Sequence, residues 1–170
     1  MWTATGAVNR SRVLEGGLYM LNVLISVGDG GVLPTRATRE SAGFDLYSPL
    51  YYNAQPRSNI VIDTLIGLAY KSIPEGFIVY AQIKGRSGLS IKTSIEVCNA
   101  GVIDQDYRGT IKIKLYNNSD KIYKICKGDR IAQIIFFLIP KVVLTPVKTE
   151  EFTTLFNTER GNNGLGSSGK

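Results

Sequence analysis

The sequence predicts an all-β fold, and three observations support this prediction. Apolar and polar side chains alternate in several short stretches, most clearly in Thr-Ile-Lys-Ile-Lys-Leu-Tyr at residues 110–116, and this two-residue period is typical of a half-buried strand. Most of the stretches are rich in β-branched residues and are bounded by Gly, Pro, Asn or Asp, which favour turns. They recur along the chain at the spacing of a β-sandwich or β-barrel.

In chain order, the pattern predicts strands at residues 19–27, 59–65 and 77–83, one short helix at about 87–92, and a strand at 93–97. Residues 110–116 and 121–126 form a predicted hairpin, because Asn-Asn-Ser-Asp at 117–120 is a typical turn sequence. Residues 131–139 and 142–147 are the last predicted strands. The apolar stretch at 131–143 is not a membrane helix, because Gln133, Pro140 and Lys141 break it well short of the ~20 apolar residues that a membrane span needs.

The length of 170 residues is that of one domain with its own core. We expect residues 1–18 to be a leader or N-terminal extension of uncertain role, 19–147 to be the barrel, and 148–170 to be a C-terminal arm. The arm is too polar to fold alone, so it is either a loose tail or a segment that orders on a ligand or a neighbouring subunit. Residues 1–18 lack the apolar core of a secretory signal. We therefore expect a cytoplasmic or nuclear protein, with organelle targeting left open by Arg10 and Arg12.

The composition excludes several kinds of chemistry. The chain has no histidine, so Ser-His and Cys-His nucleophiles and histidine-ligated metals are excluded. Any metal must bind oxygen ligands, as Mg²⁺ does. Cys98 and Cys126 are interpreted as reduced thiols in the core. The net charge of +6 suits an anionic partner such as a nucleotide, but alternating lysines equally fit the solvated face of a sheet. Without a basic surface interleaved with aromatic residues, we expect neither nucleic-acid nor membrane binding.

Five short segments combine small residues with groups that bind phosphate or metal. They are Ala-Gly-Phe-Asp-Leu at 42–46, Arg-Ser-Gly-Leu at 86–89, Gly-Val-Ile-Asp-Gln-Asp-Tyr-Arg-Gly at 101–109, Gly-Asp-Arg-Ile-Ala-Gln at 128–133, and Arg-Gly-Asn-Asn-Gly-Leu-Gly-Ser-Ser-Gly at 160–169. The glycines of the last segment free backbone N–H groups to surround an anion. A helix that begins near Ser87 offers such groups too. Taken singly, these segments also fit a helix capped by Ser87, an acidic surface turn and a solubilising tail.

The segment at 101–109 is predicted to be a tight β-hairpin whose tip lies close to a ligand. An aspartate there can orient and deprotonate a water molecule, which contributes roughly 10²–10⁴ in rate, and the tyrosine can pack flat on a sugar or base. In the other segments, Asp45 can hold a hydrated Mg²⁺ and Arg130 can bind a carboxylate or a phosphate. Gln133 needs a hydrogen-bond partner inside its apolar strand.

In this order and at this spacing, the five segments resemble the five motifs of the trimeric dUTP diphosphatases (dUTPases), over about residues 32–169. The segments at 101–109 and 128–133 are the most specific. The resemblance implies a jelly-roll β-barrel that forms a homotrimer with active sites at subunit interfaces. It also implies Mg²⁺-assisted hydrolysis of dUTP to dUMP and pyrophosphate by in-line attack of water on the α-phosphate. This reaction limits uracil in DNA and supplies dUMP for thymidylate synthesis.

The resemblance also implies residue roles. Asp104 orders the attacking water, Asp45 holds Mg²⁺ through water, the hairpin binds uracil through backbone groups, and Tyr107 lies under the deoxyribose. The C-terminal arm closes as a lid. The implied substrate-binding residues are Arg86, Ser87, Gly88, Asn99, Gly101, Val102, Ile103, Tyr107, Gln133, Arg160, Leu165, Gly166, Ser167 and Ser168.

Leu165 departs from the family pattern, which has phenylalanine stacked on the uracil ring at this position. Leucine covers the ring by apolar contact but lacks the aromatic stack, so we expect catalysis with a weaker KM or slower lid closure. Ser168 replaces the usual threonine and keeps the hydroxyl. Two alternatives stay open: a dUTPase-fold protein that binds a partner under nucleotide control, and a dCTP deaminase-like enzyme.

Overall fold

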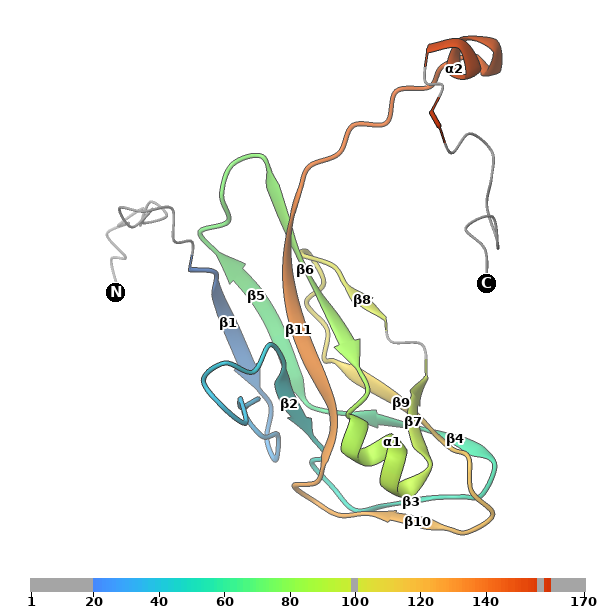
Figure 1. Ribbon diagram of the computed structural model, residues 1–170. Coiled ribbons are helices and arrows are strands. Elements are labelled where there is room, and N and C mark those ends of the chain that lie inside the picture. The colour runs from blue at the N-terminus through green and yellow to red at the C-terminus, as the bar shows by residue number, and fades with distance from the viewer. Residues whose placement is uncertain (1–19, 99–100, 156–157, 160–170) are drawn as a thin grey trace, which may run out of the picture.

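The computed structural model describes residues 20–98, 101–155 and 158–159, and strands dominate them. The strands are β1 (Asn22–Val27), β2 (Phe44–Tyr47), β3 (Tyr52–Ala54), β4 (Ser58–Asp63), β5 (Ile66–Lys71), β6 (Phe77–Lys84), β7 (Ile95–Cys98), β8 (Val102–Ile103), β9 (Lys112–Asn117), β10 (Tyr123–Ile125) and β11 (Arg130–Pro140). Two short helices accompany them, α1 (Ser87–Thr93) and α2 (Thr149–Leu155) (Figure 1). The predicted all-β jelly-roll barrel is confirmed.

The strands pair antiparallel in four sheets, and most partners are distant in sequence. The largest sheet has the order β2-β11-β6-β8, and a second has the order β4-β9-β7. Two smaller sheets pair β1 with β5 and β10 with β3. The long strand β11 lies between β2 and β6 (Figure 1). It therefore joins segments from the beginning, middle and end of the barrel.

Alternate side chains of these strands form one aliphatic core. In β9, Ile113 and Leu115 are buried, whereas Lys112 is exposed and Lys114 is only partly buried, as the two-residue period predicts. The buried apolar residues are mainly isoleucines, whose branched side chains suit a pleated surface. The core cluster comprises Leu46, Ala54, Ile62, Ile66, Leu68, Ala81, Ile83, Ile95, Ile111, Ile113, Leu115, Ile125, Ile131, Ala132 and Ile134.

The predicted hairpin of residues 110–116 and 121–126 is wrong. The chain does turn at 117–120, but β9 pairs with β4 on one edge and β7 on the other. A strand has only two edges, so β10 cannot join β9 and pairs with β3 instead. The turn sequence therefore predicted the reversal of the chain correctly, but it did not predict the strand partner.

Other boundaries also differ from the prediction. The predicted strand at 59–65 ends at a corner where Leu65 has a φ of 60°, and the strand β5 that follows was missed. Strands β2 and β3 were missed because they are short. No strand forms at 142–147, since this segment has no pairing partner among the described residues and its apolar side chains are exposed. After β11 the chain runs away from the sheets to α2, a second helix that the sequence did not predict (Figure 1).

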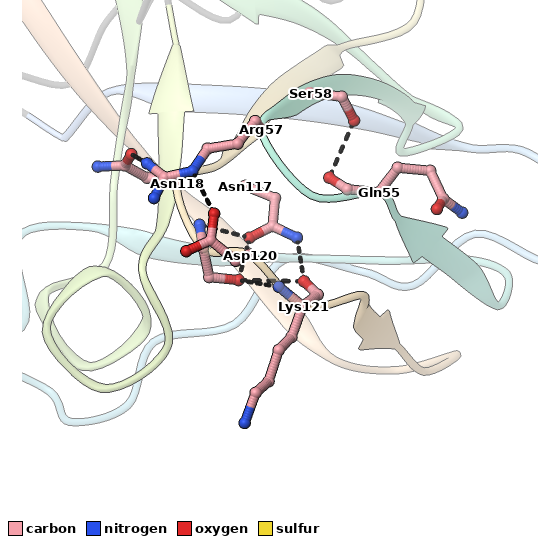
Figure 2. A network of polar contacts seen from close by, with 8 residues as sticks. Gln55, Arg57, Ser58, Asn117, Asn118, Asp120 and Lys121 are labelled. Carbon is pink, nitrogen blue, oxygen red and sulfur yellow. Dashed lines mark hydrogen bonds and ion pairs between the residues drawn. The ribbon is translucent and has the colours of Figure 1, made fainter.

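A polar network fixes the turn between β9 and β10 (Figure 2). The fully buried Asn117 donates from Nδ2 to the carbonyls of Ala54 and Lys121, at 2.9 and 2.8 Å. Its Oδ1 accepts from the backbone N–H and the hydroxyl of Ser119. The N–H of Asn118 donates to the carbonyl of Ser94, the residue that ends α1. The network therefore anchors the far end of the helix that follows the 86–89 segment.

Both cysteines are free thiols, as predicted, but neither is a core residue. Cys98, the last residue of β7, is half-buried, and Cys126, which follows β10, is exposed. Within residues 20–98, 101–155 and 158–159, no helix has the length and apolarity needed to cross a membrane.

Candidate active site

Strand pairing brings three of the five segments together. Gln133 of β11 pairs with Asp45 of β2 on one side and with Lys84 at the end of β6 on the other. Arg86 follows directly after β6. The segments at 42–46, 86–89 and 128–133 are distant in sequence, yet antiparallel register places them side by side. The sequence alone could not show this convergence.

A three-residue ion cluster lies at this junction. Asp45 is buried, with 11% of its side chain exposed. Its Oδ1 is 2.8 Å from Nε of Arg86, and its Oδ2 is 3.4 Å from Nη1 of Arg130. Arg86 also donates from Nη1 to the backbone carbonyl of Arg130 at 3.4 Å. Each carboxylate oxygen therefore serves one arginine, and the two guanidinium groups are held next to each other against like-charge repulsion.

Gln133 has the partner that the sequence requires. Its Nε2 donates to the carbonyl of Gly85 at 2.9 Å, which places its carboxamide beside the chain that leads into Arg86. Gly43, the residue that precedes β2, lies on the other side of the same carboxamide. Arg130 likewise has a definite partner, because it binds the carboxylate of Asp45. The sequence left carboxylate and phosphate equally open.

Arg86, and not Ser87, occupies the cap position of α1. Arg86 has an extended backbone, with φ −98° and ψ 125°, and no side chain caps the helix. The carbonyl of Arg86 accepts from the N–H groups of Leu89 and Ser90. Interpreting Ser87 as a capping residue is therefore wrong. Ser87 and Gly88 begin the helix beside the guanidinium of Arg86, at a strand-to-helix turn as predicted.

The segment at 101–109 forms an exposed turn at the edge of the largest sheet. Strand β8 pairs with β6, with Ile103 opposite Ala81, and not with a returning strand of its own segment. The predicted hairpin is thus replaced by an edge strand and a tight turn, in which the N–H of Tyr107 donates to the carbonyl of Asp104. Asp104 is exposed at the start of this turn.

Side chains brace this turn. Gln105 accepts from the N–H of Val79 on β6 at 3.0 Å, and Arg108 donates to the carbonyls of Gln105 and Tyr107. The hydroxyl of Tyr107 donates to the carbonyl of Thr110, and its ring covers Gly109 so closely that a side chain at Gly109 would overlap it. The ring of Tyr107 is therefore held, with 43% of the residue exposed.

Asp104 and the ion cluster lie far apart within one chain. Ile103, the last residue of β8, lies opposite Ala81 of β6. Extending this register by one residue sets Asp104 about six residues along the strand direction from Arg86, which follows β6. At about 3.3 Å per residue, the separation is roughly 20 Å. A ligand that met both groups within one chain would have to span about this distance.

A cavity of about 270 Å³ lies next to the ion cluster, beneath α1. Arg86 and Arg130 form part of its wall, and Leu89 and Ile95 part of its apolar lining. The remaining lining residues are Gly88, Lys92, Thr93, Leu115, Tyr123, Ile125, Asp129 and Ile131. The cavity thus combines cationic groups with an aliphatic floor.

The donor set at Asp45 fits a hydrated cation and not a protein cage. Within the part of the chain that the structure describes, no group of three or more His, Cys, Asp or Glu side chains comes together. Asp45 is a lone carboxylate, and each of its oxygens is ion-paired with an arginine. Mg²⁺ commonly keeps several waters and takes one carboxylate together with substrate phosphates. This mode of binding is the one that the residues present allow.

Several predicted site residues lie outside the described residues. They are Asn99, Arg160, Leu165, Gly166, Ser167 and Ser168. Gly101 and Val102 are described at the sheet edge, where the carbonyl of Gly101 accepts from the N–H of Ile83 and the side chain of Val102 is exposed. The contacts of Gly43 and of the Gly85 carbonyl with Gln133 were not predicted, because they form only between segments that are distant in sequence.

Comparisons with known proteins identify the family. The protein-family model for dUTPase matches residues 29–169. The deoxyuridine 5'-triphosphate nucleotidohydrolase of Mus musculus is 37% identical, covering 98% of this chain and 94% of that protein. The structure of the Staphylococcus bacteriophage 80alpha dUTPase with dUPNHPP has a TM-score of 0.71 and 27% identity, covering 88% of this chain and 99% of that one. A mutant dUTPase of phage phi11 of S. aureus, described with a structural Mg(II) ion, has a TM-score of 0.65 and 25% identity, covering 77% and 99%. The chain therefore belongs to the dUTPase family.

Proposed function

We propose that the protein is a dUTP diphosphatase that hydrolyses dUTP to dUMP and pyrophosphate. The observation that carries this proposal is the convergence of Asp45, Arg86, Arg130 and Gln133 at one junction. Fixed guanidinium and amide donors suit a polyphosphate, because phosphoryl chemistry depends mainly on placement and on neutralising charge. In the cell, the reaction would limit uracil in DNA and supply dUMP for thymidylate synthesis.

In the proposed reaction, a water molecule hydrogen-bonded to Asp104 attacks the α-phosphorus in line with the departing pyrophosphate. Asp104 takes the proton of that water as general base. Arg86, the first N–H groups of α1 at Ser87 and Gly88, and Gln133 hold the phosphates. These donors lie at fixed positions before substrate arrives, so little reorganisation is needed during the reaction.

We propose that the magnesium ion binds at Asp45 through water. The observation that supports this is a single buried carboxylate at the junction that would hold the phosphates, because Mg²⁺ commonly takes one carboxylate together with water and substrate phosphates. When bound, Mg²⁺ would neutralise charge on the triphosphate. Asp45 would therefore fix the positions of the arginines and of the ion relative to one another.

The turn at 101–109 is proposed to bind the nucleoside. Backbone groups at Asn99, Gly101, Val102 and Ile103 match the edge of uracil and reject the amine of cytosine, whose donor pattern is reversed. The ring of Tyr107, held over Gly109, would lie under the deoxyribose and exclude a 2′-hydroxyl.

The assembly is proposed to be a homotrimer in which each active site combines chains. The separation of roughly 20 Å between Asp104 and Arg86 within one chain supports this, since one bound nucleotide must meet both. The exposed apolar residues Val142, Val143 and Leu144 after β11 support an arm that covers another subunit. We propose that Arg160, Leu165, Gly166, Ser167 and Ser168 then close over the substrate, with Leu165 on the uracil ring.

Mixing two inactive variants tests the shared site. Asp104→Asn and Arg86→Gln should each be inactive alone, with losses of roughly 10²-fold or more. Coexpressed in equal amounts, they should recover about a quarter of the wild-type activity, because random assembly pairs an intact cluster with an intact turn in that fraction of sites. The control is Asp104→Asn coexpressed with the double variant, which can form no intact site. Failure of the first mixture to recover activity, with mixed oligomers shown to be present, would contradict a site shared between chains.

A substrate panel separates the proposed function from its alternatives. Wild-type protein should release pyrophosphate from dUTP and not from dCTP, dTTP or UTP. Ammonia release from dCTP would instead identify a deaminase. Nucleotide binding without turnover would favour a regulatory binding protein.

The free thiols of Cys98 and Cys126 support a reducing intracellular location, cytoplasmic or nuclear.

A further inference from the structure

We propose that Gly43 is a positioning residue for Gln133, and that its lack of a side chain keeps the Gln133 carboxamide aimed at the phosphates. This inference rests on the proposed dUTP hydrolysis, in which Gln133 holds substrate. The carboxamide lies in a slot with two sides. One side is the carbonyl of Gly85, which accepts from Nε2 at 2.9 Å, and the other is the backbone at Gly43.

The slot has no room for a methyl group at Gly43. A Cβ there would lie 2.5 Å from Oε1 of Gln133 and 3.3 Å from its Cβ and Cδ. Separations below 3.0 Å between such atoms are not tolerated, so the carboxamide would have to move. Because Oε1 is the end of a flexible side chain, Gln133 would swing away and lose its hydrogen bond to Gly85 while the strands stay paired.

The requirement at Gly43 is spatial and not conformational. Gly43 is absent from the glycines with positive φ, which among the described residues are Gly30, Gly76 and Gly128. Alanine is therefore compatible with the backbone at this position. Any effect of Gly43→Ala must come from the contact with Gln133, which is why the substitution is a sharp test.

The strand register explains why this one glycine matters. Gln133 pairs with Asp45 on β2, and Ile134 with Phe44, so the chain at Gly43 continues past the side chain of Gln133. On the opposite edge Gln133 pairs with Lys84, which carries the chain to Gly85 and Arg86. The Gln133 side chain thus contacts the segments on both sides of β11, and its orientation fixes the position of its amide relative to the Arg86 guanidinium.

We test this with four proteins: wild type, Gly43→Ala, Gln133→Ala and the double variant. Gly43→Ala should lower kcat/KM for dUTP by about 10- to 100-fold, the loss expected when one hydrogen bond to a charged phosphate is misplaced. Gln133→Ala should lose a similar factor. In the Gln133→Ala background, adding Gly43→Ala should cost at most about twofold, because the shared interaction is already gone. Multiplied losses in the double variant would overturn the inference.

The matched control is Gly67→Ala. Gly67 also lacks a positive φ, and a Cβ there would meet Ser26 Cβ at an ordinary 3.5 Å. The same Cβ would lie 3.8 and 4.0 Å from the carbonyl oxygens of Gly109 and Arg108, also ordinary contacts that move nothing in the turn. This variant adds the same methyl group within a strand and should keep kcat/KM within about twofold of wild type. Thermal unfolding of all variants should stay close to wild type, because the Gln133 hydrogen bond is exposed. A large fall in unfolding temperature for Gly43→Ala alone would mean a folding defect and overturn the positioning role.

A readout without turnover separates this inference from the proposed function. The chain has four glutamines, at 55, 82, 105 and 133, so ¹⁵N-glutamine labelling gives a short set of side-chain amide signals. The signal of Gln133 is the one missing in Gln133→Ala. Gly43→Ala should shift it and speed its hydrogen exchange, and Gly67→Ala should not. If wild type fails to hydrolyse dUTP, the proposed function is wrong, but the shift of the Gln133 signal still tests whether Gly43 positions the Gln133 carboxamide. An unmoved Gln133 signal in Gly43→Ala overturns it.

Discussion

Replacing Asn117 with alanine should destabilise the fold severely. The side chain is fully buried and takes part in four hydrogen bonds. Two go from Nδ2 to the carbonyls of Ala54 and Lys121, and two come to Oδ1 from the N–H and hydroxyl of Ser119 (Figure 2). Since a net hydrogen bond is worth about 1 kcal/mol, the loss should be about 4 kcal/mol. Typical domains have only about 5–15 kcal/mol of stability.

The assay is urea unfolding at one fixed protein concentration, because association with other chains would make the apparent stability depend on concentration. The midpoint should fall with little change in slope. Asn118→Ala is the matched control, since the neighbouring asparagine is exposed and its Oδ1 accepts only from Arg57 among the contacts described. That variant should lose no more than about 0.5 kcal/mol.

Two outcomes would refute the reasoning. One is a loss below about 1 kcal/mol for Asn117→Ala, which would mean that water replaces the asparagine at no cost. The other is an equal loss for Asn118→Ala, which would mean that the turn depends on polarity in general. Asn117→Asp sharpens the test, because a carboxylate oxygen would face the carbonyls of Ala54 and Lys121, so it should be at least as unstable as the alanine variant.

Three further predictions concern single groups. Burial raises the pKa of Tyr70 to about 12 from 10.0, so the contribution of the neutral phenol to folding stability is complete below pH 10.0 and is lost as pH rises to about 12. The buried hydroxyl of Tyr70 has no hydrogen-bond partner among the described residues. Tyr70→Phe should therefore make the unfolding free energy less dependent on alkaline pH, and at neutral pH the variant should be at least as stable as wild type. The guanidinium of Arg57, by hydrogen bond and charge, lowers the pKa of the exposed Asp120. In thermal unfolding, the small stability difference between wild type and Asp120→Asn should therefore be present above pH 3.8 and shrink as pH falls below it, and it should also shrink in high salt. Leu165→Phe should lower KM for dUTP or speed lid closure by restoring the ring stack, and identical KM and kcat would contradict the role given to Leu165.

Much of the fold followed from local pattern. Alternation correctly predicted that Ile113 and Leu115 of β9 face inward. The helix predicted at 87–92 begins at the observed first residue of α1 and ends one residue short of its observed end. Strand partners could not be predicted in the same way. The hairpin of β9 and β10 was wrong because β4 and β7 already occupy both edges of β9, and no local signal reports which edges are taken.

For the site, too, the sequence predicted the residues involved but not their contacts across the sheet. Residue types and their order along the chain determined that this protein handles phosphate without histidine, and they identified Asp45, Arg86 and Gln133 as members of one family signature. Only the tertiary structure decided that Asp45 holds both Arg86 and Arg130, and that Gly43 and Gly85 enclose the Gln133 carboxamide. The reason is physical. Chemistry and local geometry belong to residues and their neighbours in sequence, whereas contacts across β2, β11 and β6 depend on strand register, which the burial of the whole sheet sets.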